Sequence, residues 1–225
     1  MREKSVLAAC IAALALTVAG CGSKTSTQQN PVTGLTKRVL LSNSQTGAVT
    51  IMDAKHDVFS NKTLGVPGAS KMITAGGFTA VMESNQNGVT IIDNTQEKVL
   101  SSGPTAGPPF DIALSPDGKV VWAATRNPGV VQAFDTASGN LLANIAVPSA
   151  SRLSLSPQGT RLLVFVDDPQ SLPAPNTNAA FIINTANISS STPANPVIGP
   201  GFDQPFTAVW NGSENQAFIL NCGAE

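Results

Sequence analysis

Three aspartates at near-equal spacing are the residues that most suggest shared chemistry. Asp53, Asp93 and Asp135 each end a short apolar run, with the sequences VTIMD, VTIID and VQAFD. Carboxylates gathered in one place could bind a metal ion. An aspartate after a strand can equally accept hydrogen bonds from the backbone amides of the next turn. Because the three recur in otherwise similar runs, we interpret them as turn residues.

Other side chains that could support catalysis are few. His56 is the single histidine, it lies in the polar turn DAKHD, and no G-x-S-x-G motif is present, so a serine hydrolase triad is not indicated. There is no C-x-x-C motif for a zinc or haem site. Asp167 and Asp168 precede a proline-rich loop, where they could bind calcium or form a solvated turn. The sequence therefore predicts no catalytic residue, no metal site and no cofactor.

The elements that must position these residues are short strands in a repeat. The clearest copy spans residues 107–147 and contains four apolar runs separated by SPDG, RNPG and DTASGN. Successive copies are spaced by 41 residues at two sets of glycines, Gly47, Gly88 and Gly129, and Gly77, Gly118 and Gly159. The runs are short, rich in Val, Ile, Leu and Phe, and bounded by turn signals, so strands are expected in place of helices.

A period near forty built from four strands is typical of a β-propeller blade. Each such sheet has two apolar faces that only neighbouring sheets can cover, so the blades must stack. The first copy begins on a second strand at 37–43, and the fifth stops after PFTAVW and QAFILN. We therefore expect an all-β fold over residues 37–225: a partial propeller of about four four-stranded blades, open or incomplete, and truncated relative to a longer propeller.

Asp111 and Arg152 are the candidate channel-lining residues. Both lie on first strands, PFDIALS and SRLSL, and first strands line the central channel of a propeller. Their expected counterparts, Ser70 and Thr207, share no chemistry with them. The mixed set favours a solvated channel. Trp122 and Trp210 are expected in the core between blades.

The run SPDGKVVWAA, at 115–124, and the run FDTASGNLLANIAV, at 134–147, resemble the YVTN-type β-propeller repeat. The resemblance extends over about residues 37–221 and weakens where Ala75-Gly76-Gly77 replaces S-P-D-G. It implies an exported propeller, commonly seven-bladed. It does not specify a function, because propellers include both binding modules and enzymes.

The N-terminus carries an export signal. Arg2 and Lys4 precede an apolar run of thirteen residues, 6–18, which is too short for an ordinary transmembrane helix. The run leads into Val18-Ala19-Gly20-Cys21, which resembles a bacterial lipoprotein signal; an ordinary secretory signal is the alternative. The resemblance implies cleavage after residue 20 and acylation of Cys21, the membrane anchor. The polar segment 21–36 would be a flexible tether. The same resemblance to lipoproteins implies, from Gly22, sorting to the outer membrane, facing the periplasm or the surface.

Charge and cysteine content limit the partners. The net charge is −1 and only 12% of residues are charged, so nucleic acid is not an expected partner. Loss of residues 1–20 would remove Cys10, and acylation of Cys21 would leave Cys222 as the one free thiol. Cys222 is then either a small buried residue or a thiol whose partner is missing.

These observations predict a lipid-anchored envelope propeller that acts as a non-enzymatic binding or scaffold module for an envelope protein or polymer. The alternative is a lactonase-like propeller hydrolase whose active site lies partly in absent C-terminal blades. A third hypothesis is self-association through open strand edges, since an unpaired strand at 216–221 would favour it.

Overall fold

The computed structural model describes residues 32–166, 180–197 and 205–221. All of these residues belong to one compact unit, Val32–Glu225. Their regular structure consists of β-strands alone. This part of the chain contains no helix long and apolar enough to cross a membrane.

The strands form five antiparallel sheets. The first sheet contains β1 (Arg38–Asn43), β2 (Ala48–Asp53) and β3 (Val58–Gly65). The second contains β4 (Ala69–Ala75), β5 (Phe78–Glu83), β6 (Gly88–Asp93) and β7 (Lys98–Pro104). The third contains β8 (Pro109–Leu114), β9 (Val120–Thr125), β10 (Val130–Asp135) and β11 (Leu141–Ala146). The fourth contains β12 (Ala150–Leu155), β13 (Arg161–Val166), β14 (Ala180–Asn184) and β15 (Ala194–Val197), and the fifth contains β16 (Pro205–Trp210) and β17 (Ala217–Asn221).

The repeat expected from the sequence is confirmed. In each complete sheet the strands are paired in chain order, from first to fourth. Three sheets have four strands, and among the described residues the first sheet lacks a first strand and the fifth has two strands only. The fold is therefore all-β and β-propeller-like, with incomplete sheets at both ends of the series.

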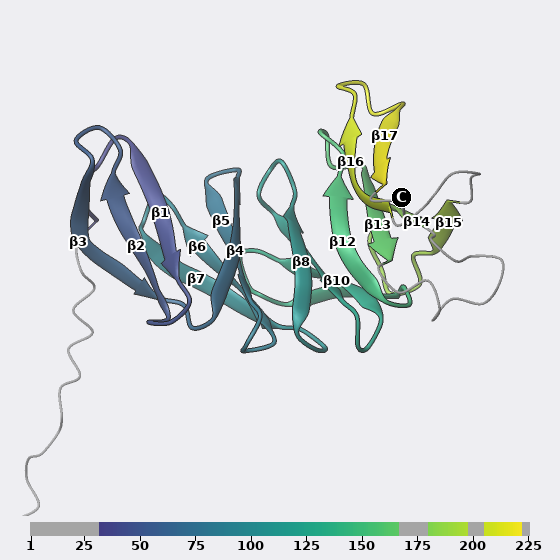
Figure 1. Cartoon of the computed structure of the whole chain (residues 1–225), viewed down its shortest axis with the longest axis horizontal. Helices are drawn as coiled ribbons and strands as arrows, with labels where there is room; N and C mark the ends of the chain where they lie inside the picture. Colours follow the sequence, from purple (N-terminus) through teal and green to yellow (C-terminus); the bar gives the residue numbers. More distant parts are fainter. Residues whose placement is uncertain (1–31, 167–179, 198–204, 222–225) are drawn as a thin grey trace, which may run out of the picture. The chain divides into compact units, whose positions relative to one another are not determined.

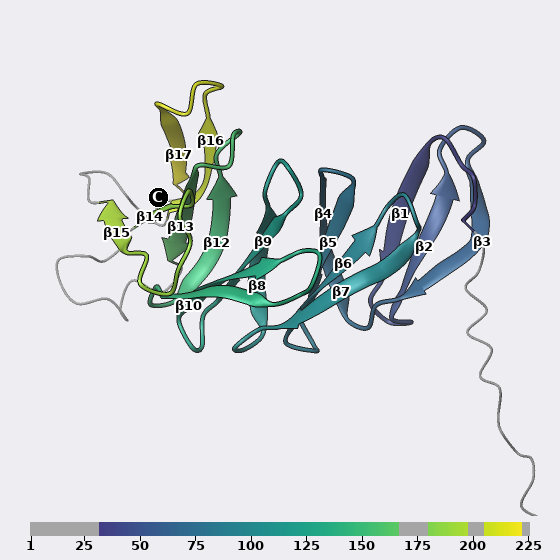
Figure 2. The ribbon, with the colours of Figure 1, turned by 180° about the vertical axis from the view of Figure 1, so that it is seen from behind.

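Neighbouring sheets pack face to face in sequence order (Figures 1 and 2). Direct contacts join β1 to β4, β4 to β8, β8 to β12 and β12 to β16, whereas the fourth strands have few contacts with one another. We call β4, β8, β12 and β16 the inner strands. Each interface holds its own apolar cluster, such as the one around Trp122 between the third and fourth sheets. This arrangement buries both faces of the middle sheets.

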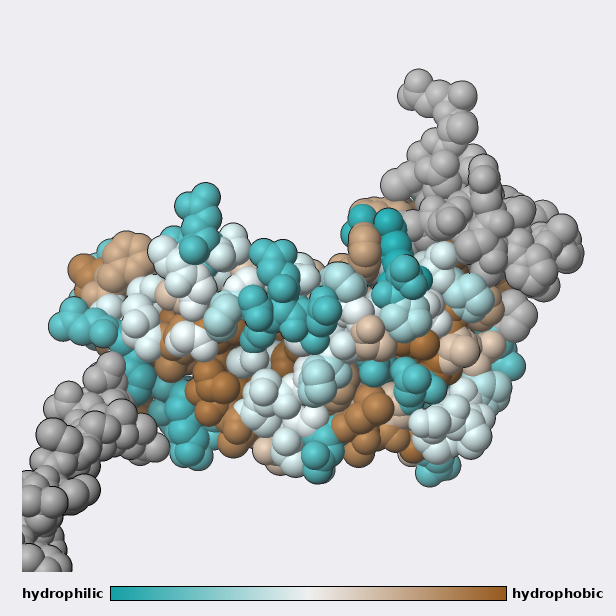
Figure 3. All heavy atoms as spheres, turned by 90° about the horizontal axis from the view of Figure 1, so that it is seen from below, coloured by the Kyte–Doolittle hydropathy of each residue, from teal (hydrophilic) through white to brown (hydrophobic). Residues whose placement is uncertain are grey.

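Some apolar side chains remain exposed at the strand edges. Phe59 on β3 and Phe218 on β17 are 66% and 65% exposed. On the face drawn in Figure 3, apolar and polar side chains alternate over short distances and form no single apolar surface. The exposed apolar residues are therefore distributed over several strands.

Candidate functional site

Each inner strand carries a β-bulge near its start. The pairing with the second strand skips one residue in each sheet, and the skipped residues are Ser70, Phe110, Ser151 and Phe206. A bulge breaks the alternation of side chains and redirects its neighbours. In β8 this leaves Pro109 and Asp111 both buried while Phe110 between them is exposed.

The bulge corrects one expectation from the sequence. Ser70 was expected to be the counterpart of Asp111, but Ser70 aligns with Phe110, and the true counterpart is Lys71. The expected position was wrong by one residue. An alignment by sequence does not show which residue is the bulge, and the bulge residue has no partner on the second strand. The set that follows the bulge is therefore Lys71, Asp111, Arg152 and Thr207.

Asp111 joins three sheets. Its side chain forms an ion pair with Lys71 of β4, and its Oδ2 accepts a hydrogen bond of 2.9 Å from the backbone amide of Leu153 on β12. The residue is 7% exposed. Its carboxylate is thus committed to contacts within the protein, and it holds the inner strands β4, β8 and β12 together.

Two arginines lie over exposed phenylalanine rings beside this junction. The guanidinium carbon of Arg126 is 3.9 Å from the centre of the Phe110 ring, and that of Arg152 is 5.1 Å from the Phe206 ring. The two phenylalanines are 46% and 39% exposed. These distances are those of cation–π contacts. We call these four residues the phenylalanine–arginine row.

The strands hold the row in place. Phe110 and Phe206 are bulge residues of β8 and β16, and Arg152 directly follows the bulge of β12, which contacts both of these strands. Arg126 follows the end of β9, next to Thr125, whose hydroxyl donates to the backbone carbonyl of Pro128 at 2.7 Å. The row is therefore built on paired strands and one short turn, so its groups are preorganised.

In the second sheet the positions equivalent to Phe110 and Arg126 are occupied by serines. There Ser70 occupies the bulge and its Oγ lies 2.6 Å from Oγ of Ser84, which aligns with Arg126. Two small hydroxyl groups replace a ring and a guanidinium. The aromatic and cationic surface is consequently confined to the third, fourth and fifth sheets.

The row can bind a particular kind of ligand. Planar guanidinium groups bind carboxylates and phosphates through paired hydrogen bonds. Exposed aromatic rings pack against apolar faces of a ligand. Lys71 is paired with Asp111, and Arg152 places its guanidinium over the exposed Phe206 ring. The arrangement suits an extended anionic ligand with apolar faces.

The recurring aspartates lie at the other end of the sheets and form turns. Asp53 Oδ1 accepts the amide of Lys55 at 2.8 Å, and its Oδ2 lies 2.6 Å from Nδ1 of His56. Asp93 and Asp135 accept amide hydrogen bonds from the turns that follow them in the same way. The interpretation as turn residues is confirmed, and His56 lies at the surface with its side chain 61% exposed.

Hydrogen bonds in these turns stabilise the ionised carboxylates. The hydrogen bond from His56 is the main reason why the pKa of Asp53 lies below its ordinary value. The hydrogen bond from Ser138 lowers the pKa of Asp135 in the same way. Asp53 and Asp135 are therefore charged at neutral pH, and their carboxylates accept hydrogen bonds from the turn amides.

Trp122 is buried between the third and fourth sheets, and Trp210 is half-buried and donates to Oγ of Ser154 at 3.1 Å. Within the described ranges, no three His, Cys, Asp or Glu side chains form a group that could hold a metal ion. Cys10, Cys21, Asp167, Asp168 and Cys222 lie outside the described residues.

Sequence reasoning missed the row because its members come from different sheets. Arg126 is part of a turn, RNPG, and nothing in its sequence context relates it to Phe110. The one available signal was the dipeptide Pro-Phe, which recurs at 109–110 and 205–206 at the start of two inner strands. This dipeptide indicated that Phe110 and Phe206 hold equivalent positions, but it did not indicate that their side chains are exposed.

Comparison with known proteins supports the fold and gives no information about function. No protein-family model matches the chain, and no curated protein is significantly similar to it. A structurally similar protein is hydrazine synthase of Kuenenia stuttgartiensis, with a TM-score of 0.52 and 15% sequence identity, covering 81% of this chain and 70% of that chain. At this identity the likeness supports a common β-propeller-like architecture.

Proposed function

We propose that this protein is a lipid-anchored, propeller-like binding module of the bacterial envelope, with the phenylalanine–arginine row as its ligand surface. Two exposed rings, each with a guanidinium group above it, carry this proposal. The ligand class that fits them is an acidic polysaccharide. Its carboxylates would bind Arg152 and the apolar faces of its sugar rings would pack on the phenylalanines.

The state of Asp111 favours binding over catalysis. A general acid or base must be within reach of a substrate proton. Asp111 is buried and engaged by Lys71 and by the amide of Leu153. Each arginine of the row lies over a phenylalanine ring. The alternative, a lactonase-like hydrolase, would need further acidic, amide, histidine or arginine side chains to meet at the same place.

The cellular location rests on the sequence alone. Residues 1–20 have the order of a signal peptide, and Cys21 follows three small or apolar residues, as in lipoprotein signals. Acyl chains on Cys21 would anchor the protein to a membrane. The propeller-like unit would then face polymers of the envelope.

Titration of the full chain with a uronic-acid oligomer tests the proposed function. Binding should weaken by about tenfold or more in Arg152→Ala and in Phe206→Ala, because each removes one half of a ring–guanidinium pair. Added salt should weaken it as well, since the attraction is electrostatic. Phe59→Ala on β3 removes an even more exposed ring outside the row and should leave the affinity unchanged.

The neutral counterpart of the ligand provides the decisive comparison. A glucose oligomer of the same length should bind far more weakly than the uronic-acid oligomer. Equal affinity for both oligomers, or no effect of either substitution in the row, would refute the assignment. Turnover of the oligomer or of a lactone, lost in Arg152→Ala, would support the hydrolase instead.

A further inference from the structure

The two ends of the sheets differ in the residues that they expose. Because the strands are antiparallel, each first strand starts, and each second strand ends, at the end that carries the phenylalanine–arginine row. Each third strand ends, and each fourth strand starts, at the opposite end, where Asp53, Asp93 and Asp135 form turns. We call this opposite end the aspartate end.

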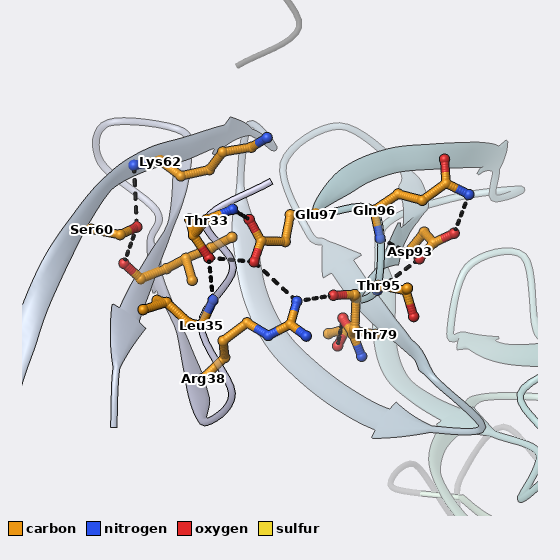
Figure 4. Close-up of polar contacts among 12 residues, drawn as sticks. Thr33, Leu35, Arg38, Ser60, Lys62, Thr79, Asp93, Thr95, Gln96 and Glu97 are labelled. Carbon is orange, nitrogen blue, oxygen red and sulfur yellow. Dashed lines mark hydrogen bonds and ion pairs between the residues drawn. The ribbon is translucent and has the colours of Figure 1, made fainter. Parts of the chain in front are cut away.

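The described chain enters its first sheet at the aspartate end (Figure 4). Thr33 donates from its amide and its hydroxyl to the carboxylate of Glu97, at 2.7 and 2.5 Å, and Glu97 belongs to the turn between β6 and β7. Arg38, the first residue of β1, pairs with Asp53 in the sheet and forms an ion pair with Glu97 at 3.0 Å. These contacts place Thr33 and Arg38 at the aspartate end.

The proposed lipid anchor is close to this end along the chain. Cys21 lies 12 positions before Thr33, and a chain of that length spans at most about 40 Å. An acylated Cys21 therefore holds the aspartate end within that distance of the membrane, a step that rests on the acylation put forward in the proposed function. A surface held so close needs little affinity of its own for lipid, because the short link gives it a high effective concentration there.

One position at the aspartate end carries an exposed apolar side chain in three consecutive sheets. The residues are Phe59, Val99 and Leu141, which are 66%, 40% and 52% exposed. Each pairs with the third-strand residue just before the recurring aspartate, so the three positions are equivalent. Val99 and Leu141 are exposed although β7 and β11 each lie between the fourth strands of two neighbouring sheets. Their exposure is therefore a property of the repeat, not of an incomplete sheet.

The charges at the aspartate end are mixed. Exposed or partly exposed groups of both signs lie in or next to its turns: Lys55, Asp57, Lys98, Asp117 and Lys119. The ammonium group of Lys119 is 3.7 Å from the carboxylate of Asp117. Because these charges offset one another, attraction to anionic lipid is weak, and apolar contact is the main favourable term at a lipid surface.

We propose that the aspartate end rests on the lipid surface, with Phe59, Val99 and Leu141 in the headgroup region and the phenylalanine–arginine row pointing away from the membrane. The three side chains come from consecutive sheets, so they contact one surface together. Strands of six residues are about 20 Å long, which holds the row at about that height above the lipid. A long envelope polymer then reaches the row without meeting the bilayer.

Two dye positions in the second sheet test this orientation. The acylated protein, in a Cys222→Ser background, carries one added cysteine, either Thr95→Cys in the turn after β6 or Gln86→Cys in the turn before it. Both residues are exposed, and they lie at opposite ends of β6. In phosphatidylcholine vesicles that contain a nitroxide-labelled lipid, the dye at residue 95 should be quenched at least about twofold more than the dye at residue 86.

Serine substitutions identify the side chains that make the contact. Val99→Ser together with Leu141→Ser should reduce the quenching at residue 95 by about half or more, because the apolar contact is lost. Leu220→Ser is the matched control and should leave the quenching unchanged. Leu220 is also 52% exposed, but it pairs with Thr207 near the end that carries the row. Added anionic lipid should change the quenching little, and circular dichroism verifies that each variant is folded.

The possible outcomes separate this orientation from the proposed ligand. Equal quenching at the two dye positions, stronger quenching at residue 86, or no effect of the paired serine substitutions would overturn the orientation. Mass spectrometry verifies the acyl chains, and an unmodified Cys21 would overturn the orientation together with the proposed anchoring. The vesicles contain no polysaccharide, so a failure to bind the uronic-acid oligomer would count against the proposed ligand alone.

Discussion

At the scale of single residues, two buried glutamates connect neighbouring sheets. Glu97 and Glu214 both have a positive φ, of 50° and 57°, and both lie in turns. Glu97 bonds to Thr33 and Arg38 across the first interface, and Glu214 accepts from the amide of Gln158 and the hydroxyl of Thr160 across the last. Each glutamate stabilises the contact between an incomplete sheet and its neighbour.

The pKa of Glu214 makes the last interface sensitive to acid. Burial alone would raise this pKa, but the hydrogen bonds from Thr160, Ser156 and Gln158 outweigh it, and the pKa lies below its ordinary value of 4.5. A lowered pKa in the folded state means that the unfolded chain binds more protons. The contribution of Glu214 is therefore complete above about pH 4.5 and is lost as the pH falls further.

Glu214→Gln should show this dependence. At pH 7 the variant should melt a few degrees below the parent protein, because a neutral amide accepts these hydrogen bonds less strongly. The difference in Tm between the two proteins should shrink between pH 5 and pH 3, as Glu214 itself becomes protonated. Thermal unfolding followed by circular dichroism measures it. A difference that stays constant over this range would contradict the role of the charge.

Residue roles were predictable only where the repeat defined them. The turn role of Asp53, Asp93 and Asp135 followed from their recurrence, and the hydrogen bonds agree. Nothing in the sequence distinguished Glu97 or Glu214 from other polar residues in turns. Their role depends on side chains of the adjacent sheet, which local patterns do not specify.

At the scale of elements, glycine turns allow neighbouring sheets to approach closely. Gly76 and Gly77 connect β4 and β5 with φ values of +55° and +85°. A Cβ on Gly76 would lie 2.3 Å from the backbone oxygen of Asp117, in the turn between β8 and β9. A Cβ on Gly77 would meet no atom within 4 Å. Of these two glycines, Gly76 is the one at which the contact between sheets leaves no room for a Cβ.

Alanine substitutions at these two glycines separate the strain of a left-handed backbone from the clash with the neighbouring sheet. Gly77→Ala should lower the free energy of unfolding by about 1 kcal/mol, the strain of a left-handed backbone. Gly76→Ala should lower it by about 1–3 kcal/mol more, because the backbone of the third sheet must also shift. Urea denaturation measures both free energies. Equal losses in the two variants would show that the sheets are not in contact at this turn.

Strands were the most predictable elements, and bulges the least. Short apolar runs between Gly, Pro, Asp and Asn turns located the strands of the second and third sheets and β12, β13 and β14 of the fourth, in the correct order. The sequence did not indicate β15. The bulges at Phe110 and Phe206 were not foreseen, because a bulge inserts one residue without changing the apolar pattern. That single residue determines which side chains face the solvent and hence where the phenylalanine–arginine row lies.

At the scale of the whole described unit, the repeat determines where the proposed ligand surface lies. Stacking in sequence order brings the bulges of β8, β12 and β16 together and forms the row. Among the described residues the first sheet is one strand short, and a cavity lies between it and the second sheet. The sequence predicted the missing first strand, but the cavity beside it depends on how Met72 and Ile92 pack.

The proposed function depends on inner strands that lie side by side in sequence order, with Asp111 between β4 and β12. Carbodiimide cross-linking tests this order directly, because it forms an amide bond only between an amine and a carboxylate already in contact. Mass spectrometry of the digested full chain should identify a bond between Lys71 and Asp111, and it should disappear when the protein is unfolded in urea before coupling. A folded chain in which Lys71 remains unlinked, or is joined mainly to a carboxylate outside β8, would contradict the account.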